Sequence, residues 1–139
     1  MSKKIIITGG IGYIGTELCK IYSGISWNNE ILVIDNRFIS ERVNQLRNWG
    51  IDFIHGDILD KDLINKHFKD ADIVHHLAGV TDVPRIKSES SDDKDAKIEL
   101  VAEKGTQNIL DVIKADCKII FPSTHVVYEG IEKIKNNIL

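Results

Sequence analysis

The sequence has little of several residue types, and each shortage excludes a class of protein. Its two cysteines, Cys19 and Cys117, are too few for the disulfide framework of a small secreted protein, so they predict buried, reduced thiols. The net charge of −3, the scattered basic residues and an aromatic content of 6% argue against binding to nucleic acid.

Long apolar runs are also missing. No stretch approaches the roughly 18 apolar residues that cross a membrane. The basic start, Met-Ser-Lys-Lys, precedes only three isoleucines, which is too short for the core of a signal peptide. We therefore expect a cytoplasmic protein with neither a membrane nor a nucleic-acid partner.

What the sequence does contain is typical of one α/β domain. Its 139 residues are 42% apolar and 28% charged, which is ordinary for a globular protein with a core. Five short apolar runs lack polar alternation, so they predict strands that are covered on both faces, as in a parallel sheet. The runs are residues 5–7, 31–34, 51–54, 73–77 and 119–121.

Helical periodicity occupies three of the intervals between these runs. Apolar residues recur every three or four positions in segments 14–22, 63–68 and 98–113. Strands that alternate with helices at this spacing indicate βαβ units with right-handed crossovers. The sequence therefore predicts a doubly wound parallel sheet, a Rossmann fold, of about five strands.

The most informative stretch is Thr-Gly-Gly-Ile-Gly-Tyr-Ile-Gly, residues 8–15, which follows the first strand and opens the first helix. The pyrophosphate of a dinucleotide binds at a helix N-terminus, where free backbone N–H groups and the positive end of the helix dipole meet it. We expect Gly9 to allow a sharp turn, Gly12 to let the backbone approach the anion, and Gly15 to let the helix pack on the strand.

A carboxylate stands where such a site needs one. Asp35 ends the second predicted strand, twenty residues after Gly15, and can accept hydrogen bonds from the adenosine ribose. It would repel a 2′-phosphate, which favours NAD over NADP, and Arg37 slightly weakens that preference. A phosphate loop needs Gly-Lys-Ser/Thr, whereas Gly15 is followed by Thr16. A methyltransferase usually has an acidic residue directly before its glycines, where this chain has Ile7 and Thr8. The pattern therefore favours dinucleotide binding.

Three further stretches carry a family resemblance. They are His-Gly-Asp-Ile-Leu-Asp at 55–60, His-His-Leu-Ala-Gly at 75–79 and Phe-Pro-Ser-Thr-His-Val-Val-Tyr-Glu-Gly at 121–130. With the glycine turn and Asp35, they make the whole chain resemble the extended short-chain dehydrogenase/reductases, the family of NAD-dependent sugar-nucleotide epimerases and dehydratases.

The resemblance implies a role for individual residues. Asp57 would contact the adenine amino group and Ile58 its ring, while residues 77–79 would line the pyrophosphate and the nicotinamide ribose. Thr124 would be the catalytic hydroxyl that hydrogen-bonds the substrate oxygen, with Ser123 as the alternative one position earlier. No metal site is expected, because the histidines and nearby aspartates form no ligand set. The expected NAD-binding residues are Gly9, Gly12, Tyr13, Ile14, Gly15, Asp35, Asn36, Asp57, Ile58, Leu77, Ala78 and Gly79.

The sequence also departs from the family pattern. Ala102 stands where the family has an asparagine that supports the active-site water network. The family's acid/base, a tyrosine followed four residues later by lysine, is absent, because Tyr128 is followed at that distance by Glu132. We therefore expect residues 1–139 to be an incomplete NAD-binding Rossmann domain, truncated before the last strands and the substrate domain.

Three functions remain open at this stage. The first is the NAD-binding portion of a sugar-nucleotide epimerase or dehydratase, which works by transient hydride transfer to NAD and is inactive as this chain alone. The second is a stand-alone NAD-binding module or sensor without catalysis. The third is a small-carbonyl reductase of the same superfamily. The first would need a nucleotide-sugar substrate held by a C-terminal part, and a homodimer is one assembly that the family allows.

Overall fold

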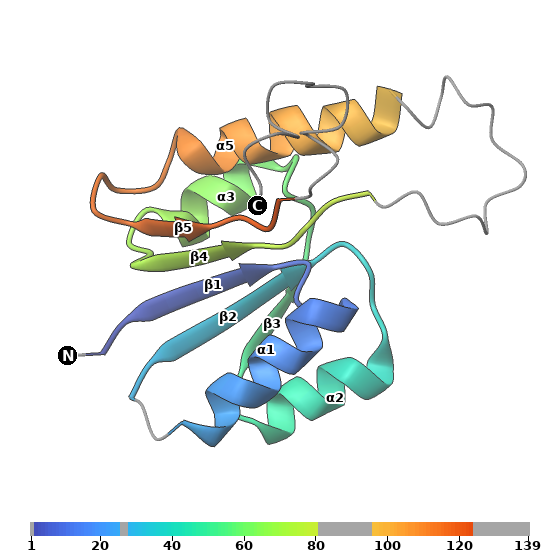
Figure 1. Ribbon diagram of the computed structural model, residues 1–139, viewed down its shortest axis with the longest axis vertical. Helices are drawn as coiled ribbons and strands as arrows, with labels where there is room; N and C mark the ends of the chain where they lie inside the picture. Colours follow the sequence, from blue (N-terminus) through green and yellow to red (C-terminus); the bar gives the residue numbers. More distant parts are fainter. Residues whose placement is uncertain (1, 26–27, 81–95, 124–139) are drawn as a thin grey trace, which may run out of the picture.

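The computed structural model describes residues 2–25, 28–80 and 96–123, and within them a five-stranded sheet in which every paired strand is parallel. The strand order is β3-β2-β1-β4-β5. Figure 1 shows the sheet edge-on between two layers of helices. The strands are β1 (Lys4–Thr8), β2 (Glu30–Asp35), β3 (Asp52–His55), β4 (Ile73–His76) and β5 (Lys118–Ile120). Each lies within one or two residues of a predicted run, and the doubly wound fold is confirmed.

The β1 strand shows why the apolar runs lack alternation. Ile5, Ile6 and Ile7 are all fully buried, although successive side chains point to opposite faces of the sheet. Ile5 and Ile7 belong to one apolar cluster and Ile6 to another. The apolar run in this inner strand therefore shows no polar alternation, because both faces of the sheet are covered there.

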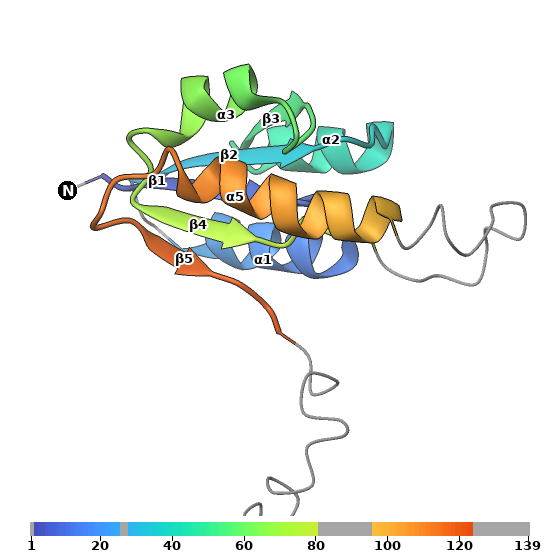
Figure 2. The ribbon, with the colours of Figure 1, turned by 90° about the horizontal axis from the view of Figure 1, so that it is seen from above.

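Each face of the sheet carries its own helices. α1 (Tyr13–Gly24) and α2 (Ser40–Asn48) lie on one face, and α3 (Lys61–Phe68), η1 (Leu100–Gly105) and α5 (Thr106–Leu110) lie on the other (Figures 1 and 2). None of the helices in the described ranges is both long and apolar enough to cross a bilayer.

The α2 helix was not singled out by the sequence pattern. It is only nine residues long and mostly polar, and its two buried residues are Val43 and Leu46. These two residues, with Ile39 before them, follow the spacing of a helix with a narrow apolar face. This signal was present but weak, since so short a helix buries little.

The long helix after residue 95 differs from its predicted extent. Helical structure runs from residue 96 to Leu110, and the six residues of η1 within it have π-helical hydrogen bonding. Val112 and Ile113, at the end of the predicted stripe, lie in the turn that follows, yet they still pack against the core. The apolar period therefore located the buried side chains and overestimated the helix by about one turn.

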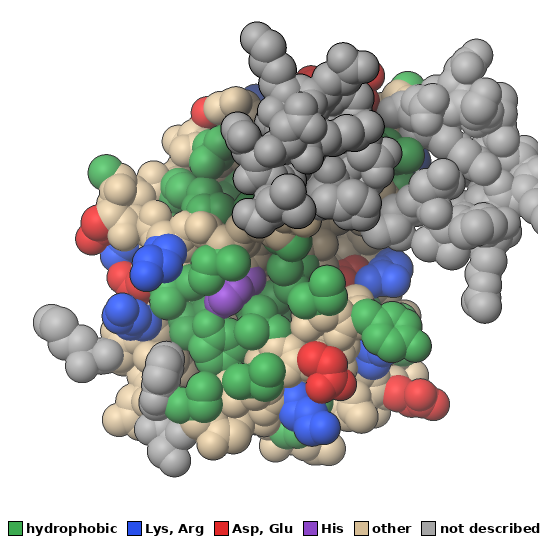
Figure 3. All heavy atoms as spheres, in the orientation of Figure 1, with side chains coloured by type: hydrophobic (Ala, Val, Ile, Leu, Met, Phe, Trp, Pro, Cys, Tyr) green, Lys and Arg blue, Asp and Glu red, His purple; other side chains and the backbone are tan. Residues whose placement is uncertain are grey.

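The β5 strand lies at the edge of the described sheet. Its Ile120 is 42% exposed, and Phe121 just after it is 57% exposed. Figure 3 shows apolar side chains gathered around a histidine on the side of the sheet where α1 packs. We expect this exposed edge to lower the stability of the chain or to alter its association.

Candidate functional site

The strand order creates a crevice at one edge of the sheet. The chain leaves β1 toward β2 on one side, and β4 later joins β1 on the other side. In open parallel sheets, such a reversal leaves a crevice at the carboxyl ends of the strands, and ligands bind there. A cleft of about 730 Å³ lies at this place, and its volume suits a small-molecule site.

All twelve of the predicted cofactor-binding residues line this one cleft. They come from four separate parts of the chain, which are the glycine turn, the end of β2, the turn after β3 and the end of β4. They are Gly9, Gly12, Tyr13, Ile14, Gly15, Asp35, Asn36, Asp57, Ile58, Leu77, Ala78 and Gly79. The structure thus brings together residues that the sequence separates by up to seventy positions.

The glycine turn has the backbone geometry that its sequence predicts. Gly9 has φ of 69°, in the region that favours glycine, and its N–H donates to Ile34 O at 2.8 Å. A Cβ on Gly9 would lie 2.8 Å from Ala78 N, and a Cβ on Gly15 would lie 2.6 Å from Gly10 Cα. Gly9 therefore allows both the turn and the approach of the β4 end, while Gly15 allows α1 to pack on the turn.

The N-terminus of α1 opens into the cleft. Gly12 is its N-cap residue in an extended conformation, and no side chain caps the helix. The first turn contains no acidic residue, and Tyr13 and Ile14 are 86% and 66% exposed. The first N–H groups of a helix have no intrahelical acceptor, so this end can bind an anion. The residues present fit a dinucleotide pyrophosphate, because the helix end has no side-chain cap and no acidic residue that would repel an anion.

Asp35 ties the end of β2 to the glycine turn. It is only 5% exposed, and its Oδ2 accepts from Ile11 N–H at 3.2 Å. Its Oδ1 accepts from the backbone N–H of Arg37 at 3.0 Å and from Arg37 Nε at 3.3 Å. A carboxylate has about four acceptor positions, so one remains for a ribose hydroxyl. Arg37 lies beside the charge that would repel a 2′-phosphate.

Arg42 holds the turn from a different element. This residue of α2 donates from Nη1 to Ile11 O, and its guanidinium lies 5.7 Å from the centre of the Tyr13 ring. A cation over an aromatic face is attracted by the ring quadrupole. Arg42 was missed in the sequence, because the helix that carries it was missed.

The two residues that are predicted to contact the adenine, Asp57 and Ile58, are held by hydrogen bonds to neighbouring segments. Asp57 accepts from Leu59 N–H at 2.9 Å and from Asn36 Nδ2 at 3.4 Å. Ile58 is 4% exposed, and its carbonyl accepts from Asn108 Nδ2 at 3.1 Å. A Cβ on Gly105 would lie 2.3 Å from Ile58 Cδ1, so the absence of that Cβ makes room for the Ile58 side chain.

The helix after residue 95 forms a wall that the motifs did not indicate. Lys97, Leu100 and Val101 line the cleft, as does Pro122 after β5. Val101 lies in the predicted helical segment 98–113, but the sequence did not assign that segment to the cofactor site. Ala102, at the position of the family asparagine, is exposed and is not among the residues that line the cleft.

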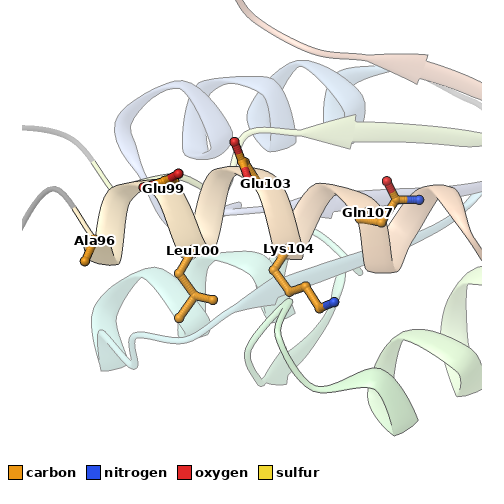
Figure 4. A pocket seen from close by; sticks show the side chains of 6 residues that line it. All are labelled: Ala96, Glu99, Leu100, Glu103, Lys104 and Gln107. Carbon is orange, nitrogen blue, oxygen red and sulfur yellow. The ribbon is translucent and has the colours of Figure 1, made fainter.

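A second hollow lies along the same helix (Figure 4). Leu100 and Lys104 point to one side of the helix, and Glu103 and Gln107 point to the other. The lining residues are Ala96, Glu99, Leu100, Glu103, Lys104 and Gln107. Because all six come from one helix, no second described element converges on this hollow.

The remaining predictions concern the catalytic hydroxyl, the two cysteines and metal binding. Thr124 lies outside the described residues, and Ser123, its sequence neighbour, is exposed. Both cysteines are free. Cys19 is buried as predicted, and burial raises its pKa to about 12, which matches an inert thiol, whereas the prediction of a buried thiol was wrong for Cys117, which is only half-buried. The described ranges hold no group of three or more side chains that could bind a metal ion.

Comparison with known proteins extends this picture. A family model, described as the 3-beta hydroxysteroid dehydrogenase/isomerase family, matches residues 6–137. The CDP-paratose 2-epimerase of Salmonella typhi is 30% identical over 145 residues, which cover 96% of this chain and 40% of that protein. The dTDP-D-glucose 4,6-dehydratase of Dictyostelium discoideum is 32% identical over 143 residues, with 97% of this chain and 32% of that protein covered.

Solved structures agree with these relatives. The UDP-glucose 4-epimerase of Bifidobacterium longum, solved in complex with NAD⁺ and UDP, matches with a TM-score of 0.71 and 26% identity. That match covers 91% of this chain and 38% of the epimerase chain. The chain thus spans about two fifths of the length of these two epimerases and about a third of the dehydratase. The chain belongs to the 3-beta hydroxysteroid dehydrogenase/isomerase family, a group of extended short-chain dehydrogenase/reductases.

Proposed function

We propose that this chain is the NAD-binding part of a sugar-nucleotide epimerase or dehydratase. The observation that carries the proposal is the single cleft at the switch point of the sheet, lined by all twelve residues that the sequence assigned to NAD. The names and bound ligands of the similar proteins support the same cofactor and substrate class.

Different residues of the cleft would bind different parts of the cofactor. The open N-terminus of α1 would hold the pyrophosphate, and Asp35 would accept from the adenosine ribose. Asp57 would contact the adenine, while Ala78 and Gly79 would lie beside the nicotinamide ribose. When bound, NAD supplies a hydride acceptor for a sugar carbon. Thr124 would donate a hydrogen bond to the oxygen on that carbon.

Titration calorimetry with NAD and with NADP tests the cofactor assignment. We expect NAD to bind, and NADP to bind about tenfold more weakly, because Asp35 repels a 2′-phosphate, with Arg37 reducing the difference. An Arg37→Ala variant should widen the gap between the two cofactors. No heat with either dinucleotide would contradict the proposal.

Residues 1–139 contain no Tyr-x-x-x-Lys sequence, and an NAD-binding module without catalysis is kept as the second candidate. Purification of the protein from its native source, followed by mass spectrometry and assay with UDP- and dTDP-sugars, separates the two. A longer polypeptide that contains this chain and turns over a nucleotide sugar supports the enzyme. A protein of 139 residues that binds NAD and leaves every nucleotide sugar unchanged supports the module.

A further inference from the structure

Three hydrogen bonds join the end of β1, the end of β4 and the start of α5 in one line. Ala78 N–H donates to Thr8 Oγ1 at 3.2 Å, and Thr8 Oγ1 lies 2.8 Å from His76 Nδ1. His76 Nε2 lies 2.9 Å from Thr106 Oγ1. Thr8 is fully buried and His76 is 2% exposed, so these groups depend on protein partners rather than on bulk water.

The chemistry of the hydroxyl group determines which atoms donate and which accept in this series of hydrogen bonds. Thr8 Oγ1 already accepts the Ala78 N–H, so its single hydrogen needs an acceptor. Among the described residues, the acceptor within reach is His76 Nδ1. A nitrogen that accepts carries no proton, so the neutral ring carries its proton on Nε2 and donates to Thr106 Oγ1.

The surroundings of His76 favour the neutral ring. Burial lowers the pKa of His76 from its ordinary value, so the imidazole is uncharged at pH 7. Its described neighbours on three sides are the hydroxyls of Thr8 and Thr106 and the ring of Phe121, whose centre lies 5.5 Å away. None of these three groups carries a charge.

At its Ala78 end, this series of hydrogen bonds joins two segments that face the cleft. Thr8 directly precedes Gly9, and a Cβ on Gly9 would lie only 2.8 Å from Ala78 N, so the glycine turn and the β4 end meet here. The backbone ladder between β1 and β4 continues as far as the Leu77 N–H, which donates to Thr8 O at 3.1 Å. The next N–H, that of Ala78, is bound by the side chain of Thr8 instead.

We propose that His76 is a positioning residue for the dinucleotide: as the Nε2-protonated imidazole, it orients the Thr8 hydroxyl and so fixes the β4 end against the glycine turn. The inference rests on the proposed function, since the two segments that it aligns are the ones assigned to the pyrophosphate and the nicotinamide ribose. At the other end, Thr106 anchors the ring to the start of α5.

Paired variants of the two adjacent histidines test this role. His76→Leu removes both hydrogen bonds, whereas His76→Asn places its Oδ1 near the position of Nδ1 and keeps an acceptor for Thr8. His75 provides the matched control, because it is also buried in β4 but faces the opposite side, where its Nε2 lies 2.7 Å from Tyr22 OH. The measurement is the dissociation constant for NAD by titration calorimetry, together with the free energy of unfolding in urea.

We expect His76→Leu to weaken NAD binding about tenfold, and His76→Asn to restore the affinity to within about threefold of the wild type. His75→Leu should lower stability to a similar degree and leave NAD affinity unchanged. Equal affinities for His75→Leu and His76→Leu, in a wild type that does bind NAD, would overturn the inference alone. A wild type that gives no heat would overturn the proposed function as well.

Nitrogen NMR of the histidine rings provides a readout that does not depend on NAD. At neutral pH, the ring that disappears in His76→Asn should show an unprotonated Nδ1 and a protonated Nε2. A protonated Nδ1 would overturn the assignment even if every variant still folds, because Thr8 would then lack an acceptor for its hydroxyl hydrogen.

Discussion

The two walls of the cleft face the same space, but they are held in place by different means. The wall formed by the glycine turn, α1 and the end of β2 depends largely on backbone conformation, such as φ of 69° at Gly9 and the N–H of Gly9 on Ile34 O, and the side chains of Asp35 and Arg42 add hydrogen bonds to it. The wall formed by the β4 end, Ile58 and the long helix depends on side chains that are distant in sequence. Asn108 binds the carbonyl of Ile58, fifty positions earlier, and Thr106 binds His76, thirty positions earlier.

This difference shows which parts of a site are encoded locally. A positive φ or an uncapped helix end requires particular residues within a few positions, so the sequence displays it as a motif. A contact between residues fifty positions apart leaves no fixed spacing. The first wall should therefore be sensitive to backbone changes, and the second to changes in side-chain volume and hydrogen bonding.

The largest effect is expected for Gly9→Ala. The turn holds residue 9 in the left-handed region, which is unfavourable for an alanine. The new Cβ would also lie within 3 Å of backbone atoms of Ala78 and Leu77, and these atoms could move only by distorting the end of β4. We expect a loss of about 3 kcal/mol or more in the free energy of unfolding, measured by urea denaturation, and no binding of NAD. Gly50→Ala is the matched control, because Gly50 has φ of 70° but no heavy atom within 4 Å.

Gly50→Ala should cost only about 1 to 2 kcal/mol and leave NAD binding intact. Equal losses for the two variants would show that the approach of the β4 end to the turn is not what Gly9 protects.

Asp35→Asn should have the next largest effect. Its amide keeps the shape of the side chain but turns an NH₂ toward one of the donors, Ile11 N–H or the Arg37 group, which leaves a buried group unsatisfied. We expect a loss of about 1 to 3 kcal/mol in stability and about tenfold weaker NAD binding. Asp52→Asn, on the exposed start of β3, should change neither quantity. An unchanged NAD affinity in Asp35→Asn would remove Asp35 from the ribose site.

The opposite wall is tested by Gly105→Ala. Its Cβ would lie 2.3 Å from Ile58 Cδ1, so the isoleucine must shift, at about 1 to 3 kcal/mol, partly offset by the higher helix propensity of alanine. Adding Ile58→Val removes Cδ1 but keeps Cγ1, which would lie 2.7 Å from the new Cβ, so it should recover only part of the loss. A double-mutant cycle in urea measures this coupling. Gly24→Ala, with no atom within 4 Å, is the control that should be neutral or stabilising.

The smallest effect is the dependence of stability on pH. Burial lowers the pKa of both His75 and His76, so below pH of about 6.5 the unfolded chain takes up protons that the folded chain does not. Stability should therefore be complete above pH 6.5 and fall as the pH drops toward the folded-state values. His76→Asn should flatten part of this slope in urea titrations between pH 5 and 7. An unchanged slope in both single histidine variants would contradict the buried, neutral rings.

The sequence anticipated the strands and the first wall more closely than the second. The isoleucines of β1 need a sheet covered on both faces, and the glycines at 9, 12 and 15 need a particular turn, so both could be predicted. Arg42 could not, because its partner Ile11 lies on another element and α2 has little apolar signal. Nor could the link from His76 to Thr106, because hydrogen bonds between distant side chains follow from the packed structure rather than from spacing.

If the open amides at the start of α1 receive the pyrophosphate of NAD, backbone amide NMR during titration with NAD should detect it. We expect the N–H signals of residues 12–15 to move the most, those of Asp35 and Asp57 to move with them, and a folded Gly12→Val variant to show no change. Movement confined to other parts of the sheet, or an unaltered response in Gly12→Val, would contradict it.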